Sequence, residues 1–470
     1  MGAPFHPHRE ARASENTGGP ADLMTIQHVL SARGHASALP RTSVMARAWG
    51  VAAGLAGLAL APQPAEAQDY DIEASRLLAS PRFEAARKSL AADYDTIVAD
   101  LITLTEIEAP PFKEARRAAA YAQMLKAAGL ENVQTDAQGN VMGLRRGSGG
   151  GPLIAVAAHL DTVFPEGTDV TVKREGNRLA APGIGDDTSS LPVLLAFIRA
   201  MDKAGYTTRA DILFLGDVGE EGPGNLRGMR HLFNEGPYAG KIDAFISFEP
   251  GKAGRITHGG IGSRRYTVTF KGPGGHSYGA FGLVNPAYAM SDAITQFARM
   301  QVPASPKTTY SVGIVEGGTS VNSIPFATTM TVDMRSESAE ELAKEEAAFL
   351  AILPGAAARE NAARSTEQGE ITYETTLIGD RPVGLTARSA PIVEYARASS
   401  EAMGFQVHYG SSSTDSNLPM SLGIPAVTLG SGFTTHRAHS LDEYLELDRE
   451  NDLASMSAGL ATLLLLAKAD

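Results

Sequence analysis

The chain has 470 residues, 43% of them hydrophobic and 20% charged, which is the composition of a globular protein too long for one ordinary core. Its 41 basic and 53 acidic residues give a formal net charge of −12, so a nucleic-acid-binding surface is not expected. The sequence contains no cysteine, which excludes disulfides and thiolate ligands and leaves histidine, aspartate and glutamate for any metal site.

Residues 1–67 are predicted to be a leader that carries a signal peptide. A positive start, Met45-Ala-Arg, is followed by an apolar run over residues 49–61 and a small-x-small cleavage signal that ends at Ala67. This order is typical of a secretory signal peptide, and the apolar run is too short to span a bilayer as a helix. We therefore expect a start at Met45 or Met24, cleavage after Ala67, and a periplasmic or secreted mature protein without a membrane anchor.

Helices and hairpins are predicted for the next part of the chain. Ser80-Pro81 marks the start of one helix and Pro110-Pro111 its end, and residues 113–130 form a second helix. Turn residues then predict two hairpins, one around residues 137–140 and one with Gly176-Asn177 at its turn.

A short apolar run over residues 154–158 predicts a buried parallel strand, and it ends in His159 and Asp161. In an open α/β sheet the ligand crevice lies beyond the carboxyl ends of the strands, so both side chains are expected at a site. Residues i and i+2 share one side of a strand, and Asp161 is therefore expected to accept a hydrogen bond from the ring of His159. Taken alone, the pattern fits a structural histidine at a strand end better than a metal ligand.

Four later segments end in acids or histidines in the same way. They are the glycine loop with Asp186 and Asp187, the strand from residue 211 that leads to Glu220 and Glu221, the strand from residue 243 that ends in Glu249, and the strand at residues 426–430 that precedes His439. Each acid alone has a structural explanation, such as capping of the next helix by Asp186. Together, strands alternating with helices predict an α/β fold whose mostly parallel, doubly wound sheet gathers these side chains at one edge.

These residue types suit two divalent cations. Metals such as zinc take imidazole nitrogen and carboxylate oxygen, and a shared carboxylate holds two of them about 3.5 to 4 Å apart. With Asp186 shared, each ion has three protein ligands and room for a bridging water, whose pKa metal binding lowers to about 7. One glutamate of the Glu220-Glu221 pair can bind metal while the other takes the proton of that water. The sequence therefore predicts a hydrolase.

Five motifs in this order resemble a known family. They are His159-Leu-Asp161, the Gly-x-Gly-Asp-Asp loop, Glu220-Glu221, Glu249-Pro250 and His439-Ser-Leu-Asp-Glu443. They are similar to those of the dizinc exopeptidases that include glutamate carboxypeptidase, acetylornithine deacetylase, succinyl-diaminopimelate desuccinylase and peptidase T, and the resemblance covers nearly everything after residue 90. One departure is Thr188, where family members often carry lysine. His436 is a second candidate ligand, but the His-Ser-x-x-Glu pattern favours His439.

The resemblance implies a role for each residue of the site. It assigns the metal ligands as His159 and Glu249 on one ion, Glu221 and His439 on the other, and Asp186 between them. It also implies Glu220 as general base and Asp161 as the residue that orients His159. Zinc is the expected metal, with cobalt or manganese as alternatives.

Between Glu249 and the last strand the predicted order changes to β-α-β-β-α-β, the ferredoxin-like unit. We expect an inserted domain at residues 262–378 between two parts of a catalytic domain, 68–261 and 379–470. In the similar proteins this insertion is the dimerisation or lid domain, which implies a homodimer. The resemblance implies that His276 of the partner subunit stabilises the oxyanion, and that Asn322 and Arg335 hold the carboxylate or backbone of the substrate.

A rival prediction is a serine hydrolase, because residues 275–279 match the Gly-x-Ser-x-Gly elbow with Ser277 as nucleophile. An elbow needs a strand directly before it and a helix directly after it, and here Gly272-Pro-Gly intervenes before and the next helix waits until Pro286. A binding domain without activity is also disfavoured, because every expected ligand type is present.

The substrate is expected to be a small peptide or an N-acyl amino acid. Among the similar proteins, glutamate at the position of Glu249 accompanies carboxypeptidases and deacylases, while aspartate there accompanies aminopeptidases and dipeptidases. Arg335 adds a physical reason, because a guanidinium binds a carboxylate through two parallel hydrogen bonds. We therefore predict a carboxypeptidase or deacylase, with an aminopeptidase or dipeptidase as the alternative.

Overall fold

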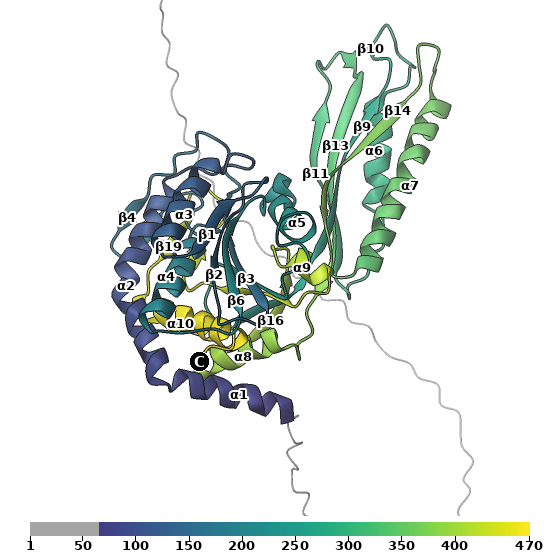
Figure 1. The fold of residues 1–470 in the computed structure, drawn as a ribbon. Coiled ribbons are helices and arrows are strands. Elements are labelled where there is room, and N and C mark those ends of the chain that lie inside the picture. Colours follow the sequence, from purple (N-terminus) through teal and green to yellow (C-terminus); the bar gives the residue numbers. More distant parts are fainter. Residues whose placement is uncertain (1–64) are drawn as a thin grey trace, which may run out of the picture. The chain divides into compact units, whose positions relative to one another are not determined.

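The computed structural model describes residues 65–470 (Figure 1). Residues 1–64, which include nearly all of the predicted signal peptide, lie outside the described residues. Helix α1 (Ala65–Leu78) begins two residues before the predicted cleavage point at Ala67. Within the described part, no helix combines the length and the apolar character that crossing a membrane requires.

A nine-stranded sheet carries the elements that the sequence predicted for the catalytic part. Its order is β1-β2-β6-β3-β7-β17-β8-β15, and β16 also pairs with β8. The strands are β1 (Glu131–Thr135), β2 (Val141–Arg145), β3 (Leu153–His159), β6 (Asp211–Asp217), β7 (Ala244–Glu249), β8 (Arg255–Gly260), β15 (Gly384–Leu385), β16 (His408–Ser412) and β17 (Ala426–Gly430). The central strands β6, β3, β7 and β17 run parallel, whereas β1, β2 and β8 pair antiparallel with their neighbours toward the edges. The predicted parallel centre is thus confirmed.

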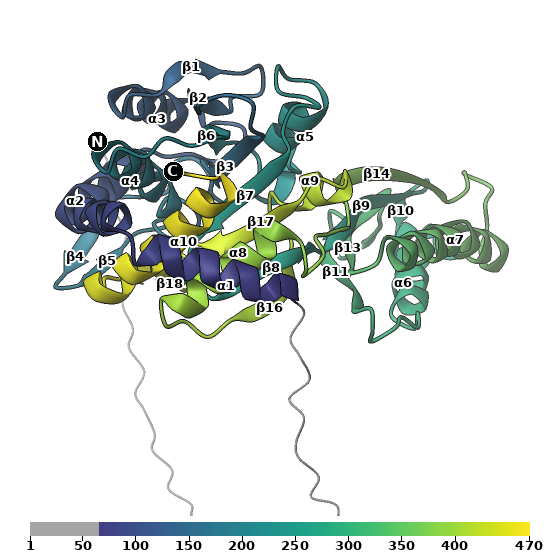
Figure 2. The same cartoon turned by 60° about the horizontal axis from the view of Figure 1, so that its bottom comes forward.

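The central strands are apolar because helices cover both faces of this sheet. In β3, Ile154 and Val156 belong to one core while Ala155 and Ala157 belong to the other, as the two-residue period of a strand requires. The first core is covered by α2 (Pro81–Thr105), α3 (Ala115–Ala127), α4 (Ser190–Lys203), α8 (Pro391–Ala402) and α10 (Arg449–Leu466), and the second by α5 (Arg227–Asn234) and α9 (Asn417–Ser421). Figure 2 shows α1 lying along α8 and α10.

Helix α2 begins as predicted. The Ser80 hydroxyl oxygen accepts a hydrogen bond from the Phe83 amide at 3.1 Å, and Pro81 occupies the first helical position, where no amide hydrogen is needed. The two predicted hairpins are also present, as β1 with β2 and as β4 (Lys173–Glu175) with β5 (Arg178–Ala180). The second hairpin continues into a small sheet with β19 (Tyr444–Glu446) and β18 (Thr434–His436). This sheet holds the two ends of the loop that carries His439.

The remaining strands form a separate four-stranded antiparallel sheet with the order β11-β13-β9-β14. Its elements are β9 (Gly262–Lys271), α6 (Pro286–Phe297), β11 (Thr308–Gly317), β13 (Ala327–Ser336), α7 (Ala339–Ala363) and β14 (Thr372–Arg381), in the predicted β-α-β-β-α-β order. The two helices cover one face around Phe270, Phe297 and Phe349. A two-residue strand, β10 (Gly275–His276), pairs with β12 (Ser323–Ile324) at the far end of this sheet (Figure 1).

The last strand of this sheet differs from the prediction. Strand β14 continues through residue 378, where we expected the inserted domain to end, as far as Arg381. The helical pattern over residues 338–350 predicts a shorter helix than α7, which continues through Pro354 to Ala363. The division of the chain at residues 262 and 378 stays a prediction.

Candidate metal centre

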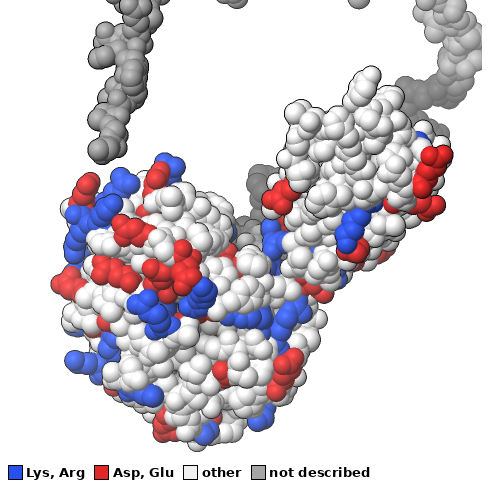
Figure 3. All heavy atoms as spheres, turned by 90° about the horizontal axis from the view of Figure 1, so that it is seen from above, with Lys and Arg blue, Asp and Glu red and all other residues white. Residues whose placement is uncertain are grey.

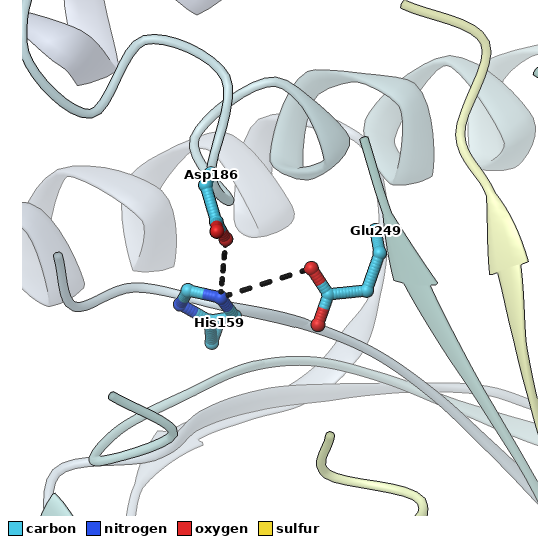
Figure 4. A group of neighbouring side chains, drawn as sticks. All are labelled: His159, Asp186 and Glu249. Carbon is cyan, nitrogen blue, oxygen red and sulfur yellow. Dashed lines mark hydrogen bonds and ion pairs between the residues drawn. The ribbon is translucent and has the colours of Figure 1, made fainter. Parts of the chain in front are cut away.

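Three of the predicted ligands meet where β3, β7 and the loop before α4 end. Figure 4 shows the His159 ring directed at the carboxylates of Asp186 and Glu249. The His159 Nε2 atom lies 3.1 Å from Asp186 Oδ1 and 4.0 Å from Glu249 Oε2. One donor atom from each residue lies within 4.8 Å of the others, which is close enough for a common ion.

A second group shares Asp186. The His439 Nε2 atom lies 3.1 Å from Asp186 Oδ2 and 2.9 Å from Glu221 Oε1. Because the first imidazole faces Oδ1 and the second faces Oδ2, one carboxylate stands between two groups of ligands. The structure thus brings together all of the residues that the sequence predicted as ligands.

The chemistry of this cluster fits divalent cations. Burial raises the pKa of Glu221, and burial together with the charge of Asp187 raises that of Glu249 well above its ordinary value. Hydrogen bonds to Asp186 and Glu221 raise the pKa of His439 to about 10. The cluster therefore favours added positive charge, and imidazole nitrogen with carboxylate oxygen is a ligand set that zinc and similar metals accept.

Glu220, the predicted base, lies beside these ligands. Its side chain is buried and lines a pocket of about 490 Å³ together with Asp186, Glu221, Glu249 and His439. Hydroxyl groups form another part of the wall, and four arginines also line the pocket: Arg255, Arg265, Arg335 and Arg381. Acidic side chains thus share this pocket with four arginines.

The expected bond between Asp161 and the His159 ring needs correction. The His159 Nδ1 atom lies 3.0 Å from the main-chain carbonyl oxygen of Asp161 and 3.9 Å from its carboxylate. That carboxylate instead accepts hydrogen bonds from the amides of residues 219, 220 and 221, at 2.8, 3.2 and 2.9 Å. The negative charge of the Asp161 carboxylate is stabilised by three amide donors. The His159 ring needs only one acceptor, and the Asp161 carbonyl supplies it. Asp161 thus fixes the backbone that carries Glu220 and Glu221.

The loop of Asp186 is held by a residue whose part in the site the sequence did not predict. The Glu443 carboxylate is buried and accepts hydrogen bonds from the amides of Gly183, Gly185 and Asp186, at 2.9, 2.8 and 3.0 Å. A Cβ atom at Gly185 would lie 1.5 Å from the Thr435 hydroxyl, so only glycine fits there. The available signal was Glu443 in the motif that also identifies His439.

Thr188, where the sequence departs from the family pattern, has a buried cation as neighbour. The Arg117 guanidinium of α3 is fully buried and donates from Nη1 to the Thr188 hydroxyl at 3.0 Å and to the Leu160 carbonyl at 2.8 Å. Leu160 stands between His159 and Asp161, so Arg117 links the end of β3 to the loop of Asp186. Sequence reasoning missed Arg117, although an arginine on the apolar face of a helix is a signal.

The three residues predicted on the inserted domain separate in the structure. Arg335 lines the pocket and donates from Nε to Asp333 at 2.7 Å. His276 is exposed on β10, and the carbonyl of Asn322 accepts a hydrogen bond from Ser277 at 2.9 Å, next to it. Neither His276 nor Asn322 lines the pocket of its own chain. Their predicted roles at the site of a partner subunit stay predictions.

The surroundings of Ser277 do not form a nucleophile elbow. The strand before it has two residues, and the following segment is a turn, whereas an elbow runs from a strand directly into a helix. The neighbouring His276 ring accepts from the amides of Tyr278 and Gly279 through Nδ1, both at 3.3 Å. His276 therefore supports a turn and does not activate this serine.

Comparison with known proteins adds to this geometry. A family model described as peptidase family M20/M25/M40 matches residues 155–468. Carboxypeptidase G2 from Pseudomonas sp. is 29% identical over 201 residues, which are 42% of this chain and 47% of that protein, so the match spans about half of that relative.

Solved structures share the fold. Aminopeptidase PepT from Bacillus cereus has a TM-score of 0.64 at 21% identity, and the alignment covers 79% of this chain and 98% of that one. YxeP from Bacillus subtilis, described as a dinuclear metal-binding peptidase, has a TM-score of 0.57 at 19% identity, with coverage of 80% and 99%. At these identities the likeness establishes the fold.

Proposed function

This chain belongs to peptidase family M20/M25/M40 and is an enzyme of the peptidase or amidohydrolase type, and we propose that it hydrolyses an amide bond in a small peptide or N-acyl amino acid by means of two divalent metal ions. The observation that carries the proposal is Asp186, whose two carboxylate oxygens each lie 3.1 Å from a different imidazole. A carboxylate placed between two ligand groups is the arrangement that a pair of metal ions needs. We propose zinc, with cobalt or manganese as alternatives.

Each residue has a distinct part in the proposed reaction. His159, Glu249, Glu221 and His439 hold the two ions, and Asp186 lies between them. The ions, when bound, supply electrostatic activation of a water molecule and of the scissile carbonyl. Glu220 accepts the proton of the attacking water and delivers it to the leaving amine. Asp161 keeps Glu220 and Glu221 in place through its three hydrogen bonds to their turn.

We propose further that the substrate presents a free carboxylate on the leaving side of the bond. Arg335 lines the pocket, and its Nε atom binds Asp333, while its two terminal nitrogens have no partner among the described residues. A guanidinium in this state can bind a carboxylate through two parallel hydrogen bonds. Glu249 supports the same choice, because glutamate at this position accompanies carboxypeptidases and deacylases in the similar proteins.

Chelation tests the metal-dependent reaction. Dipeptides, N-acyl amino acids and short peptides are incubated with the protein before and after removal of metal, and then with zinc, cobalt or manganese added back. We expect chelation to abolish hydrolysis and zinc or cobalt to restore it, while a serine-directed phosphonate has no effect. If the phosphonate inhibited hydrolysis and the chelator had no effect on it, Ser277 would be the nucleophile and the proposal would be overturned.

One peptide in three forms tests which end is recognised. The free peptide, its N-acetylated form and its C-amidated form are compared in kcat/KM. Amidation removes a charge that Arg335 would bind, and it should cost about 1.5 to 3 kcal/mol, a loss of roughly tenfold to more than a hundredfold. Acetylation should have a much smaller effect. The opposite result, with acetylation abolishing cleavage, would identify an aminopeptidase.

A further inference from the structure

Glu220 accepts hydrogen bonds from Arg381, a residue that has no part in the proposed reaction. The Arg381 Nη1 atom donates to the Glu220 carboxylate at 2.8 Å, and Nη2 donates to the Glu220 main-chain carbonyl. Nη1 also donates to the Ser413 hydroxyl at 3.0 Å. Arg381 and Glu220 are both buried, so water competes little for these bonds.

These bonds hold Glu220 at two points, its carboxylate and its main-chain carbonyl. A carboxylate held by one charge can still rotate about its side-chain bonds, whereas a planar guanidinium bound to carboxylate and carbonyl together restrains the side chain and its backbone. On the other side of the turn, the amide of Glu220 donates to Asp161. The amide, carbonyl and carboxylate of Glu220 are therefore all restrained, while the neighbouring Glu221 faces His439.

Arg381 belongs to the inserted sheet, not to the nine-stranded sheet that carries Glu220. It is the last residue of β14, where it pairs with Ser263 of β9. The preceding residue, Asp380, receives a hydrogen bond from Arg230 at its carbonyl and donates its amide to the Asn225 side chain at 2.9 Å. From β9, Arg265 reaches the Gly222 carbonyl at 3.3 Å. The segment that follows β6 is thus held by the ends of two strands of the inserted sheet.

We propose that Arg381 is a positioning residue, which sets the orientation of the Glu220 carboxylate from the end of the inserted sheet and thereby links that sheet to proton transfer. This inference rests on the proposed function of Glu220. A base must lie within hydrogen-bond reach of the proton it takes, so a carboxylate that rotates freely spends less time in the productive orientation. Arg381 acts on the reaction through Glu220, and its loss is expected to lower turnover without weakening substrate binding.

The alternative is that Arg381 itself binds the substrate, because it also lines the pocket. The kinetic constants separate the two roles. In Arg381→Met, kcat is expected to fall roughly 10- to 100-fold, the usual effect of removing a residue that orients a reacting group, while KM changes by less than about threefold. Arg381→Lys retains the positive charge but not the planar guanidinium that binds two acceptors at once. Its kcat should therefore lie between those of Arg381→Met and the wild type. Added guanidinium should partly restore kcat in Arg381→Ala.

Arg145→Met is the matched control. Arg145 also binds one carboxylate and one carbonyl, Asp202 at 3.0 Å and Tyr206 at 2.7 Å, but it lies outside the pocket. The control should retain wild-type kcat and KM. A rise in KM at constant kcat in Arg381→Met would make Arg381 a substrate-binding residue and overturn the proposal, and so would a wild-type kcat in both Arg381→Lys and Arg381→Met. A loss of bound metal that accounts for the lost activity would overturn it as well.

A measurement without substrate keeps this inference separate from the proposed function. Amide hydrogen exchange of residues 217–226 is compared in the metal-free wild type, Arg381→Met and Arg145→Met. We expect exchange in this segment to be at least several-fold faster in Arg381→Met alone, because the turn has lost a restraint. Unchanged exchange would show that Arg381 does not hold the turn. If the wild type hydrolyses no amide, the proposed function fails, while the exchange result still decides whether Arg381 fixes Glu220.

Discussion

At the scale of single residues, Glu220 and Glu221 are neighbours with different surroundings. The Glu221 carboxylate lies 2.9 Å from the His439 ring, whereas the Glu220 carboxylate is bound by Arg381. Adjacent acids at the end of one strand therefore point to different partners. This difference supports a metal ligand at Glu221 and a base at Glu220.

Substitution by glutamine should separate these two roles. Glu220→Gln keeps the size of the side chain and removes the basic oxygen, so turnover should fall about 10²- to 10⁴-fold with both metals retained. Glu221→Gln should instead weaken metal binding. Metal content per chain and kcat, measured together for both variants, check the assignment. Lost metal in Glu220→Gln and retained metal in Glu221→Gln would reverse it.

At this scale, the sequence predicted the position of a side chain correctly where its place along a strand determines that position. His159 and Glu249 stand at the ends of buried apolar strands, so their position at the sheet edge followed from the sequence. The bond of Asp161 did not follow, because its three amide partners come from a turn whose conformation no local pattern specifies. Arg117 and Arg381 were missed for a different reason: each reaches the site from an element far away in the sequence.

At the scale of elements, helix α7 contains a buried acid without a partner. Glu345 faces the inserted sheet, and neither of its carboxylate oxygens has a hydrogen-bond partner among the described residues. Burial, together with the nearby charge of Asp333, raises the pKa of this carboxyl to about 8. The folded protein thus holds a proton on Glu345 that the unfolded chain releases near its ordinary pKa.

The pH dependence of stability follows from this shift. Between about pH 4.5 and pH 8 the folded state binds the extra proton, so the free energy of unfolding falls as pH rises through this window. Glu345→Gln removes the free-energy cost of ionising a buried carboxyl group. The substitution should stabilise the protein at pH 8.5 by roughly 1 to 3 kcal/mol and by much less at pH 4.5. Urea unfolding followed by circular dichroism at both values is the measurement.

Glu340→Gln is the control for this prediction. Glu340 lies on the same helix, but its side chain is exposed and pairs with Lys344. Its substitution should change the free energy of unfolding little at either pH. An equal gain in both variants, or a gain in Glu345→Gln that is the same at both pH values, would contradict the role of the buried proton.

The order of elements was easier to predict than their ends. The β-α-β-β-α-β order of residues 262–381 followed from alternating and helical patterns, but β14 runs past the predicted boundary and α7 past Pro354. Strand β8 was not predicted, because its residues Thr257, His258 and Gly259 form no apolar run. Its place is decided by pairing with β17 and β16, which are distant in sequence.

At the scale of the whole molecule, the end of the inserted sheet near β10 exposes large apolar side chains. Tyr278, Phe281 and Val321 are 88%, 90% and 102% exposed. Figure 3 shows few charged side chains on much of this domain. Exposed aromatic groups in one place commonly mark a surface that another protein covers. This observation supports the predicted homodimer, in which His276 enters the site of the partner subunit.

Subunit exchange tests this prediction. A His276→Ala chain and a Glu220→Gln chain are each expected to be nearly inactive alone. In a mixed dimer one site combines an intact Glu220 with an intact His276 of the partner subunit, so activity should return on mixing, up to about one quarter of the wild-type value for random exchange. A chain with both substitutions, mixed with either single variant, is the control and should restore nothing. Absence of recovery in demonstrably mixed dimers would contradict the prediction.

The pairing of β7 with β17 also has a consequence for folding. Glu249 ends β7, and the strand beside it does not begin until Ala426, so the centre of the sheet closes only after the whole inserted segment has been made. Closing so long a loop costs entropy and slows folding. Ser263 and Arg381, however, are paired neighbours in the inserted sheet. If that sheet forms first, it brings the two ends of the inserted segment together. The chain that must then close between β7 and β17 is effectively much shorter. Pulse-labelled hydrogen exchange should then find β9 and β14 protected before β17, which makes the insertion an aid to assembly of the strands around it.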